Sequence, residues 1–259
     1  MTVISFISAK GSPGVSTAVM GLAARWPNPV VVADLDPVGG DVAIRERDVD
    51  DNALDEQRGL VSLGAAVRAG DEVDLVDHLQ ETKHGIEVLV GASGPRQAQS
   101  LGPAWPHLQR TLRAHRGGDV LADGGRFIAG SPAGPVVEGS DAVVFVVRSE
   151  IAAVAHLRDR LATVREPWAL GRPGSTPVGV AVVGDPRDKR AVDDIGRLLA
   201  ASELDVTMLG TIAFDPKVVA RGAASPSRAV LRSLFSRSLV DLVPRVRALA
   251  TPSAVAQEI

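Results

Sequence analysis

Short apolar runs alternate along the chain with segments in which apolar residues recur every three or four positions. The runs predict seven strands, at 3–8, 29–36, 85–92, 119–123, 141–149, 177–185 and 208–214. The periodic segments predict helices at 16–26, 59–69, 71–80, 103–116, 151–165, 189–202 and 226–250. Because strands alternate with helices, we expect an α/β fold with a mostly parallel central sheet of seven or eight strands, flanked by helices on both faces.

The composition supports a sheet that is covered on both sides. Of the 259 residues, 45% are hydrophobic and only 3% are aromatic, so Val, Leu, Ile and Ala must fill the core. We expect a single domain over residues 1–250, followed by a flexible tail at 251–259. No apolar run approaches the roughly 20 residues that span a bilayer, and no secretory signal pattern opens the chain, so we expect a cytoplasmic protein.

Several kinds of chemistry are excluded by the residues that are missing. The sequence contains no cysteine, which removes disulfides, thiolate metal sites and cysteine nucleophiles. The five histidines show neither H-x-x-H nor H-E-x-x-H spacing, so a zinc site is not expected. With a net charge of -3, the whole chain does not bind polyanions by bulk charge.

The stretch "ISAKGSPGVSTA", residues 7–18, has the context of a phosphate-binding loop. It follows the first predicted strand and leads into a helix, where consecutive backbone amides can point at an anion. Gly11 and Gly14 allow the turns and the close approach, and Ser16 stands where a Mg²⁺-binding hydroxyl belongs. However, Val15 replaces the lysine of the pattern G-x-x-x-x-G-K-[ST]. The loop is therefore either a phosphate site that lacks one cation or a strand-to-helix turn without a ligand.

Aspartates close two of the predicted strands. Asp34 and Asp36 end one strand and Asp123 ends "DVLAD", and the carboxyl ends of parallel strands are where open α/β sheets bind ligands. We expect Asp36 to position Mg²⁺ or water, Asp123 to hold Mg²⁺ through water, and Asp41 to lie in a nucleotide-responsive loop. The alternatives are a buried strand-end cap for Asp34, a helix N-cap for Asp41 and an ordinary loop acid for Asp123. No G-x-G-x-x-G follows the first strand, which argues against a dehydrogenase.

The segment Lys10-Gly11-Ser12-Pro13-Gly14-Val15-Ser16 resembles the deviant Walker A motif of the MinD/ParA ATPases, K-G-G-x-G-K-[ST]. Ser12 replaces the second glycine and Val15 the ordinary lysine, while Lys10 matches the signature lysine of the family. The resemblance runs in order over about residues 1–250. The stretch "LDPVGGDVA" at 35–43 looks most like the pilus-assembly branch of CpaE and TadZ.

The resemblance implies ATP and Mg²⁺ as cofactors and an ATP-sandwich homodimer. In the family the signature lysine reaches the partner's phosphates, so Lys10 and Asp36 are the expected catalytic residues. Ser16, Asp36 and Asp123 are the expected metal ligands. The nucleotide contacts that it implies are Lys10, Gly11, Ser12, Pro13, Gly14, Val15, Ser16, Thr17, Asp215 and Pro216. Where relatives often carry an adenine-binding Asn, this chain reads Gly184-Asp185-Pro186, which puts base recognition in doubt. Val15 implies slow ATP hydrolysis or none.

These observations imply three functions. The first is a positioning protein that recruits a pilus or secretion machine through protein partners, at the pole, the septum or the inner membrane face. The second is an active DNA-partition ATPase. The basic segment near the C-terminus, with Arg228, Arg232 and Arg237, then binds non-specific DNA; the alternative for it is a solvated helix face. The third is a pseudo-ATPase scaffold that binds no nucleotide.

Overall fold

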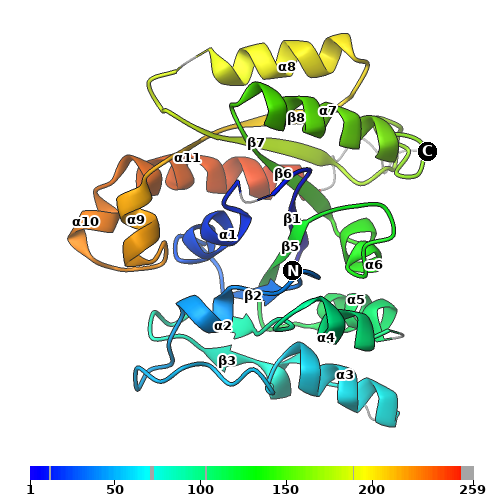
Figure 1. Cartoon of the computed structure of the whole chain (residues 1–259), viewed down its shortest axis with the longest axis vertical. Coiled ribbons are helices and arrows are strands. Elements are labelled where there is room, and N and C mark those ends of the chain that lie inside the picture. The colour runs from blue at the N-terminus through cyan, green and yellow to red at the C-terminus, as the bar shows by residue number, and fades with distance from the viewer. Residues whose placement is uncertain (12, 71–72, 103, 189, 252–259) are drawn as a thin grey trace.

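The computed structural model describes residues 1–11, 13–70, 73–102, 104–188 and 190–251. Its centre is an eight-stranded sheet with the order β3-β4-β2-β5-β1-β6-β7-β8 (Figure 1). The strands are β1 Val3–Ser8, β2 Val30–Asp34, β3 Gln80–Glu81, β4 Glu87–Leu89, β5 Asp119–Arg126, β6 Ala142–Arg148, β7 Val178–Gly184 and β8 Thr207–Ala213. β3 pairs antiparallel with β4 at one edge, and the other neighbours pair in parallel. The expected α/β fold with a mostly parallel sheet is confirmed.

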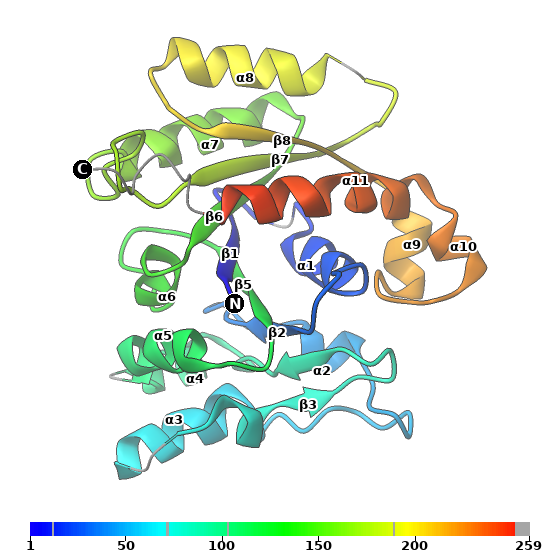
Figure 2. The ribbon, with the colours of Figure 1, turned by 180° about the vertical axis from the view of Figure 1, so that it is seen from behind.

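Helices cover both faces of this sheet. They are α1 Val15–Ala23, α2 Val42–Arg45, α3 Leu60–Ala69, η1 Leu75–His78, α4 Pro95–Ser100, α5 Ala104–Ala114, α6 Gly134–Glu138, α7 Ile151–Val164, α8 Ala191–Ala201, α9 Pro216–Arg221, α10 Arg228–Leu231 and α11 Leu234–Leu249. Figures 1 and 2 show α1 and α11 on one side of β1, with α5 and α6 on the other. The chain therefore has three layers, with the sheet in the middle.

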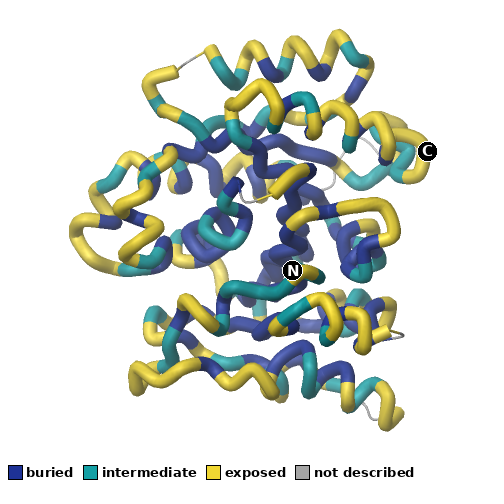
Figure 3. Tube along the Cα trace, viewed as in Figure 1, coloured by how far each residue is buried: buried dark blue, intermediate teal, exposed yellow. Residues whose placement is uncertain are grey.

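The alternation of side chains along each strand explains this layering. Ile4 and Phe6 of β1 belong to the apolar cluster under α1 and α11. Ile7 points to the opposite face and belongs to the apolar cluster that also contains residues of α7 and α8. Each of these side chains is almost fully buried, which stabilises the fold by about 1.5–3 kcal/mol per residue. Figure 3 shows this layering, with the strands as the buried centre of the chain.

The helix predicted at 71–80 is wrong. Among its described residues, Leu75–His78 form one 3-10 turn that Asp74 begins by accepting a hydrogen bond from the Val76 amide. Gln80–Glu81 then pair with β4 as an edge strand. Leu75 and Leu79 are both buried. Their spacing suggested a helix, but the two side chains reach the core from a turn and an extended segment. Residues 71–72 lie outside the described residues.

The helix predicted at 226–250 is divided into α10 and α11. Ser233 starts α11, since its hydroxyl accepts a hydrogen bond from the Ser236 amide at 3.0 Å. Pro244 lies inside α11 and does not end it. In addition, β5 continues past Asp123 to Arg126, where it still pairs with Ser8 of β1.

The predicted boundaries at Pro103 and Lys189 lie outside the described residues. Of the predicted tail at 251–259, only Thr251 is described, and its hydroxyl donates to the Arg247 carbonyl. In the part of the chain that the structure describes, no helix is both long and apolar enough to cross a membrane.

Candidate nucleotide-binding site

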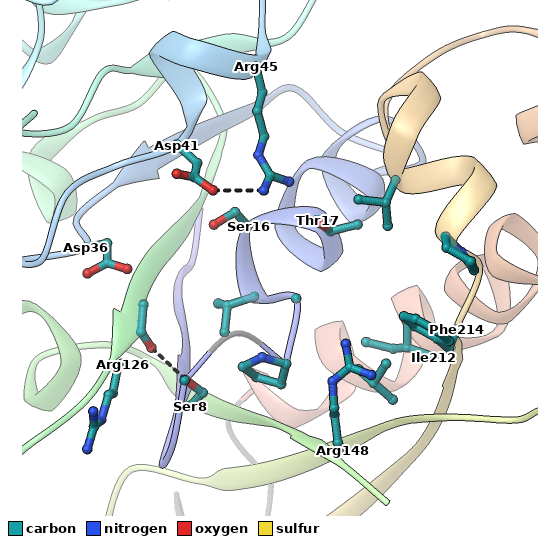
Figure 4. Close-up of a pocket in the computed structure, with 18 of the residues that line it drawn as sticks. Ser8, Ser16, Thr17, Asp36, Asp41, Arg45, Arg126, Arg148, Ile212 and Phe214 are labelled. Atoms are coloured by element: carbon teal, nitrogen blue, oxygen red, sulfur yellow. Dashed lines mark hydrogen bonds and ion pairs between the residues drawn. The ribbon is translucent and has the colours of Figure 1, made fainter. Parts of the chain in front are cut away.

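A cavity of about 640 Å³ opens at the carboxyl ends of the central strands (Figure 4). Its walls come from the loop after β1, from the ends of β2, β5, β6 and β8, and from α9 and α11. The lining residues are Ser8, Gly11, Pro13, Gly14, Val15, Ser16, Thr17, Asp36, Val38, Gly39, Asp41, Arg45, Gly125, Arg126, Arg148, Val183, Ile212, Ala213, Phe214, Asp215, Pro216, Val219 and Phe235. The fold thus brings most of the predicted site residues to one cavity, at the edge where parallel sheets bind ligands.

The loop between β1 and α1 presents its backbone to this cavity. Gly14 precedes the helix with φ +99°, a left-handed conformation that glycine adopts without strain. Among the described residues, no side chain caps the start of α1. The first amides of α1 therefore have no partner within the helix and can donate to an anion. Ser12, which was also predicted to contact nucleotide, lies outside the described residues.

Val15 lines the cavity where the phosphate-loop pattern has lysine. Its side chain is only 5% exposed and also joins the apolar cluster formed with α11. The cavity wall at this position is therefore an isopropyl group, and position 15 contributes no positive charge to the cavity.

Lys10 lies outside the cavity. Its exposed ammonium is 2.8 Å from the Nε2 atom of His156 on α7. The side chain therefore does not serve the cavity of its own chain in this structure. Its expected contact with the phosphates of a second subunit stays a prediction.

Asp123 is not among the lining residues, and its side chain is buried, with 1% exposure. Its Oδ1 accepts a hydrogen bond from the Gly125 amide at 3.0 Å, and its Oδ2 has no hydrogen-bond partner among the described residues. Burial raises the pKa of Asp123 to about 6, although the nearby Ser16 hydroxyl and the Gly125 amide lower it. An unpartnered carboxylate oxygen beside Ser16 is suited to a cation or to cation-bound water.

Asp36 lies in the loop after β2, close enough to Asp123 for the two charges to interact. Burial raises the pKa of this half-buried carboxyl, and its Oδ1 accepts a hydrogen bond from the Val38 amide at 2.8 Å. Figure 4 shows Asp36 and Asp41 on the same side of the cavity, with Ser16 next to them. Asp41 forms an ion pair of 2.9 Å with Arg45, four residues along. Although Asp41 occupies the N-cap position of α2, its side chain makes no capping bond.

Asp34 has a structural role. This agrees with the alternative given in the sequence analysis, a buried cap at the end of a strand. It is 1% exposed, and its Oδ2 accepts a hydrogen bond from the Val42 amide at 3.2 Å. Burial and the charge of Asp123 raise the pKa of Asp34 well above its usual value. Its carboxylate therefore anchors the start of α2 instead of lining the cavity.

The opposite end of the cavity is more apolar. Asp215 and Pro216, the residues predicted near the base, line it together with Phe214. The Asp215 carboxylate caps α9 by accepting from the Lys217 and Val218 amides at 3.0 and 3.3 Å. Asp185 is not among the lining residues, and its side chain accepts from the Arg187 amide instead. These residues offer stacking surface with few free polar groups.

The sequence reasoning missed Arg45, Arg126, Arg148 and Phe214, all of which line the cavity. Arg148 ends β6, so the rule that selected the aspartates at strand ends could also have selected this arginine. Phe214 directly precedes Asp215 and follows the last residue of β8. Only the order of strands in the sheet shows that Arg148 and Phe214 lie at the same end of the cavity.

Comparison with known proteins identifies the fold. No family model and no curated protein matches the sequence. The structure of a ParA family ATPase from Chlorobium tepidum TLS has a TM-score of 0.72 and 16% identity, over 94% of this chain and 97% of that one. The cell division ATPase MinD of Pyrococcus furiosus gives a TM-score of 0.70 and 18% identity, over 96% and 99%.

A third solved structure contains a nucleotide. The septum site-determining protein MinD of Pyrococcus horikoshii OT3, complexed with Mg-ADP, has a TM-score of 0.69 and 18% identity, over 100% of this chain and 99% of that one. At these identities the likeness concerns the fold. This chain therefore has the α/β fold of the ParA and MinD ATPases over nearly its whole length.

Proposed function

We propose that this protein is a nucleotide-binding positioning protein of the MinD/ParA type, which hydrolyses ATP slowly or not at all. The observation that carries the proposal is the composition of one cavity. It combines free amides at the start of α1, a left-handed Gly14 and the carboxylate of Asp36, and the buried carboxylate of Asp123 lies next to Ser16, just outside the lining. This is the set of groups that a nucleotide with its Mg²⁺ requires.

The residues at the Asp123 side fit Mg²⁺ as well as phosphate. Asp123 offers a buried oxygen without a hydrogen-bond partner among the described residues, and Ser16 and Asp36 lie next to it. The described residues contain no group of three or more His, Asp or Glu side chains able to hold a metal by themselves. Mg²⁺ commonly binds one or two carboxylates and completes its coordination with phosphate oxygens and water. Bound there, it would neutralise charge on the phosphates.

Val15 determines the rate of ATP hydrolysis that we expect. The lysine of an ordinary phosphate loop stabilises charge that develops on the transferred phosphoryl group. Without it, the transition state loses one preorganised donor, which costs about 2–4 kcal/mol. This corresponds to a rate roughly 30- to 1,000-fold lower. Asp36 can still orient water, so slow turnover is compatible with the site.

The position of Lys10 supports a dimer. Its ammonium is exposed and contacts His156 on α7 instead of lining the cavity of its own chain, so it is accessible to a second subunit. The dimer then encloses ATP between the two subunits. The "LDPVGGDVA" stretch favours a CpaE/TadZ-like role, in which the dimer recruits a pilus or secretion machine through protein partners. Its location in the cytoplasm, at the pole, septum or inner membrane face, is set by those partners.

Sedimentation velocity with ATP·Mg²⁺, with ADP·Mg²⁺ and without nucleotide tests this proposal. We expect a dimer with ATP·Mg²⁺ and a monomer without nucleotide. Lys10→Ala should abolish the dimer, whereas Lys83→Ala, which removes an exposed lysine paired with Asp51, should not. If Lys10→Ala dimerises as the wild type does, the role of Lys10 across the subunits is wrong.

A partition ATPase is the second candidate, and one feature favours it. Arg228 on α10, Arg232 just after it and Arg237 on α11 are all exposed, and none has an ion pair with another described residue. Such a surface can bind a phosphate backbone. ATP turnover measured with and without DNA separates the two candidates, because a partition ATPase is expected to accelerate on DNA.

A further inference from the structure

Arg148 is a cation inside the cavity that the proposed site does not yet use. It is the last residue of β6, and its guanidinium carbon lies 4.7 Å from the centre of the Phe214 ring. Both residues line the cavity. Figure 4 shows Arg148 extending toward the end of the cavity where Ile212 and Phe214 lie. An arginine on an aromatic face is held by cation–π attraction, so the pair forms a defined surface.

The guanidinium keeps its hydrogen-bonding capacity for a ligand. Among the described residues, its closest acidic partner is Glu150, with an N–O distance of 3.9 Å, and Glu150 is itself 70% exposed. No hydrogen bond to a described residue engages the Arg148 side chain. By comparison, Arg45 in the same cavity is held by Asp41 at 2.9 Å. Arg148 therefore carries a charge that the protein compensates only weakly.

The order of strands fixes where Arg148 lies relative to a bound nucleotide. β1 leads into the phosphate loop, and β5, which carries Asp123, and β2, which leads into the loop with Asp36, lie on one side of it. β6, β7 and β8 follow on the other side. A nucleotide with its phosphates at α1 and its metal beside Asp123 must therefore extend its sugar and base over the ends of β6 to β8. Arg148 and Phe214 both line this part of the cavity.

We propose that Arg148 is a nucleotide-binding residue that supplies, from β6, the positive charge that Val15 cannot supply from the phosphate loop, and that with Phe214 it forms the surface on which the base stacks. The inference rests on the proposed function. Because this cation lies on the sugar side of the phosphates, it contributes to binding of nucleoside diphosphates and triphosphates alike. It does not restore the stabilisation of the γ-phosphoryl group, so slow hydrolysis is retained.

Base selectivity follows from the same surface. Stacking on an aromatic ring and a guanidinium plane accepts any base, because every base has a π face. The Asp215 carboxylate is engaged in capping α9, and Asp185 lies outside the cavity lining. ADP and GDP are therefore expected to bind with affinities within roughly threefold of each other.

Calorimetric titration of the full chain with ADP·Mg²⁺ tests the inference. Arg148→Ala should weaken binding roughly tenfold, since it removes both a charge and a stacking surface. Arg172→Ala is the matched control, because Arg172 is an exposed arginine that pairs with Glu166 and lies outside the cavity lining. It should change the affinity by less than about threefold. Arg148→Lys, which keeps the charge and loses the planar group, should weaken binding by a factor between those of Arg148→Ala and the control variant.

Thermal unfolding without nucleotide shows whether each variant folds. Should Arg148→Ala fail to fold, Arg148→Lys and Phe214→Leu carry the test, and both should weaken ADP binding. If the wild type binds ADP and these variants bind it equally well, Arg148 has no role and the inference is wrong, while the proposed function stands. If the wild type binds no nucleotide at millimolar concentration, the proposed function and the inference both fail. A preference for ADP over GDP of more than tenfold would contradict binding by stacking.

Discussion

The carboxylate of Asp36 fills the space beside the α-carbon of Gly125. A Cβ atom on Gly125 would lie 2.0 Å from the Asp36 Oδ2 atom and 2.1 Å from its Cγ atom. Gly125 also has φ +55°, in the left-handed region. The loop after β2 and the end of β5 are thus in direct contact through a carboxylate and a glycine, at the side of the cavity where Mg²⁺ is expected.

Gly125→Ala should displace Asp36 and weaken Mg²⁺-dependent nucleotide binding. The matched control is Gly130→Ala, because Gly130 also has a left-handed backbone, with φ +75°, but a Cβ there meets no atom within 4 Å. In both variants the left-handed backbone conformation costs about 1 kcal/mol of folding stability. Only Gly125→Ala should reduce the ADP affinity measured with Mg²⁺, and equal binding by the two variants would show that the contact has no role.

Asp123→Asn should change stability and binding in opposite directions. Burial raises the pKa of Asp123 to about 6, so its negative charge at pH 7 destabilises the folded state. Removing the charge should raise the free energy of unfolding by about 1–3 kcal/mol without nucleotide. The same change should abolish the gain in ADP affinity that Mg²⁺ provides. Asp41→Asn, at a 48% exposed side chain, is the control for urea unfolding. A destabilised Asp123→Asn would contradict this view of the charge.

Val15→Lys should strengthen ATP binding roughly tenfold and raise turnover, because the new amine can extend from the buried position into the cavity. Val15→Met is the uncharged control of similar length. ATP titration and phosphate release measure the two effects. If lysine and methionine give the same affinity and rate, the absence of a cation at position 15 does not limit this site.

Asp119 offers a test of the fold away from the cavity. Burial raises its pKa, but hydrogen bonds from Trp26, Thr2 and Asn28 outweigh burial, so the pKa of Asp119 is lowered. The Trp26 indole N–H donates to its Oδ2 at 2.9 Å. Asp119→Ala should cost about 1–3 kcal/mol at pH 7, because it leaves these donors unpaired.

The pH dependence of that cost follows from the lowered pKa. The contribution of the Asp119 carboxylate is fully present above the unfolded value of 3.8. It is lost as the pH falls through the lower folded value. The difference in urea stability between wild type and Asp119→Ala should therefore be constant from pH 7 to about 5 and shrink below about 4. A difference that shrinks above pH 5 would contradict the assignment.

The strands and site residues that the sequence predicted correctly are those that a local pattern of residues determines. The central strands are continuous apolar runs, and Gly14, Ser16 and Asp36 follow strands or open a helix and line the cavity, as the sequence predicted. Helices α2, α6, α9 and α10 are too short to show a helical period, so they were not predicted as separate elements. The start of α11 depends on one capping serine inside a periodic segment.

The base end of the cavity could not be predicted in the same way. Arg148 ends β6 and Phe214 follows β8, two strands that are separated in the sheet by β7, and only the strand order and the side-chain directions bring the two residues into contact. Similarly, the position of Lys10 beside His156 depends on how α7 packs near the phosphate loop. These relationships are tertiary, and no local pattern of residues encodes them.

The central claim is that backbone amides at the start of α1 still bind nucleotide phosphates although Val15 replaces the lysine. Calorimetric titration of the wild-type protein with ATP·Mg²⁺ tests it most directly. We predict a saturable heat change with one nucleotide per chain, weakened when Mg²⁺ is chelated. A flat titration at millimolar ATP would contradict the claim and would leave only a scaffold that acts through protein contacts without nucleotide.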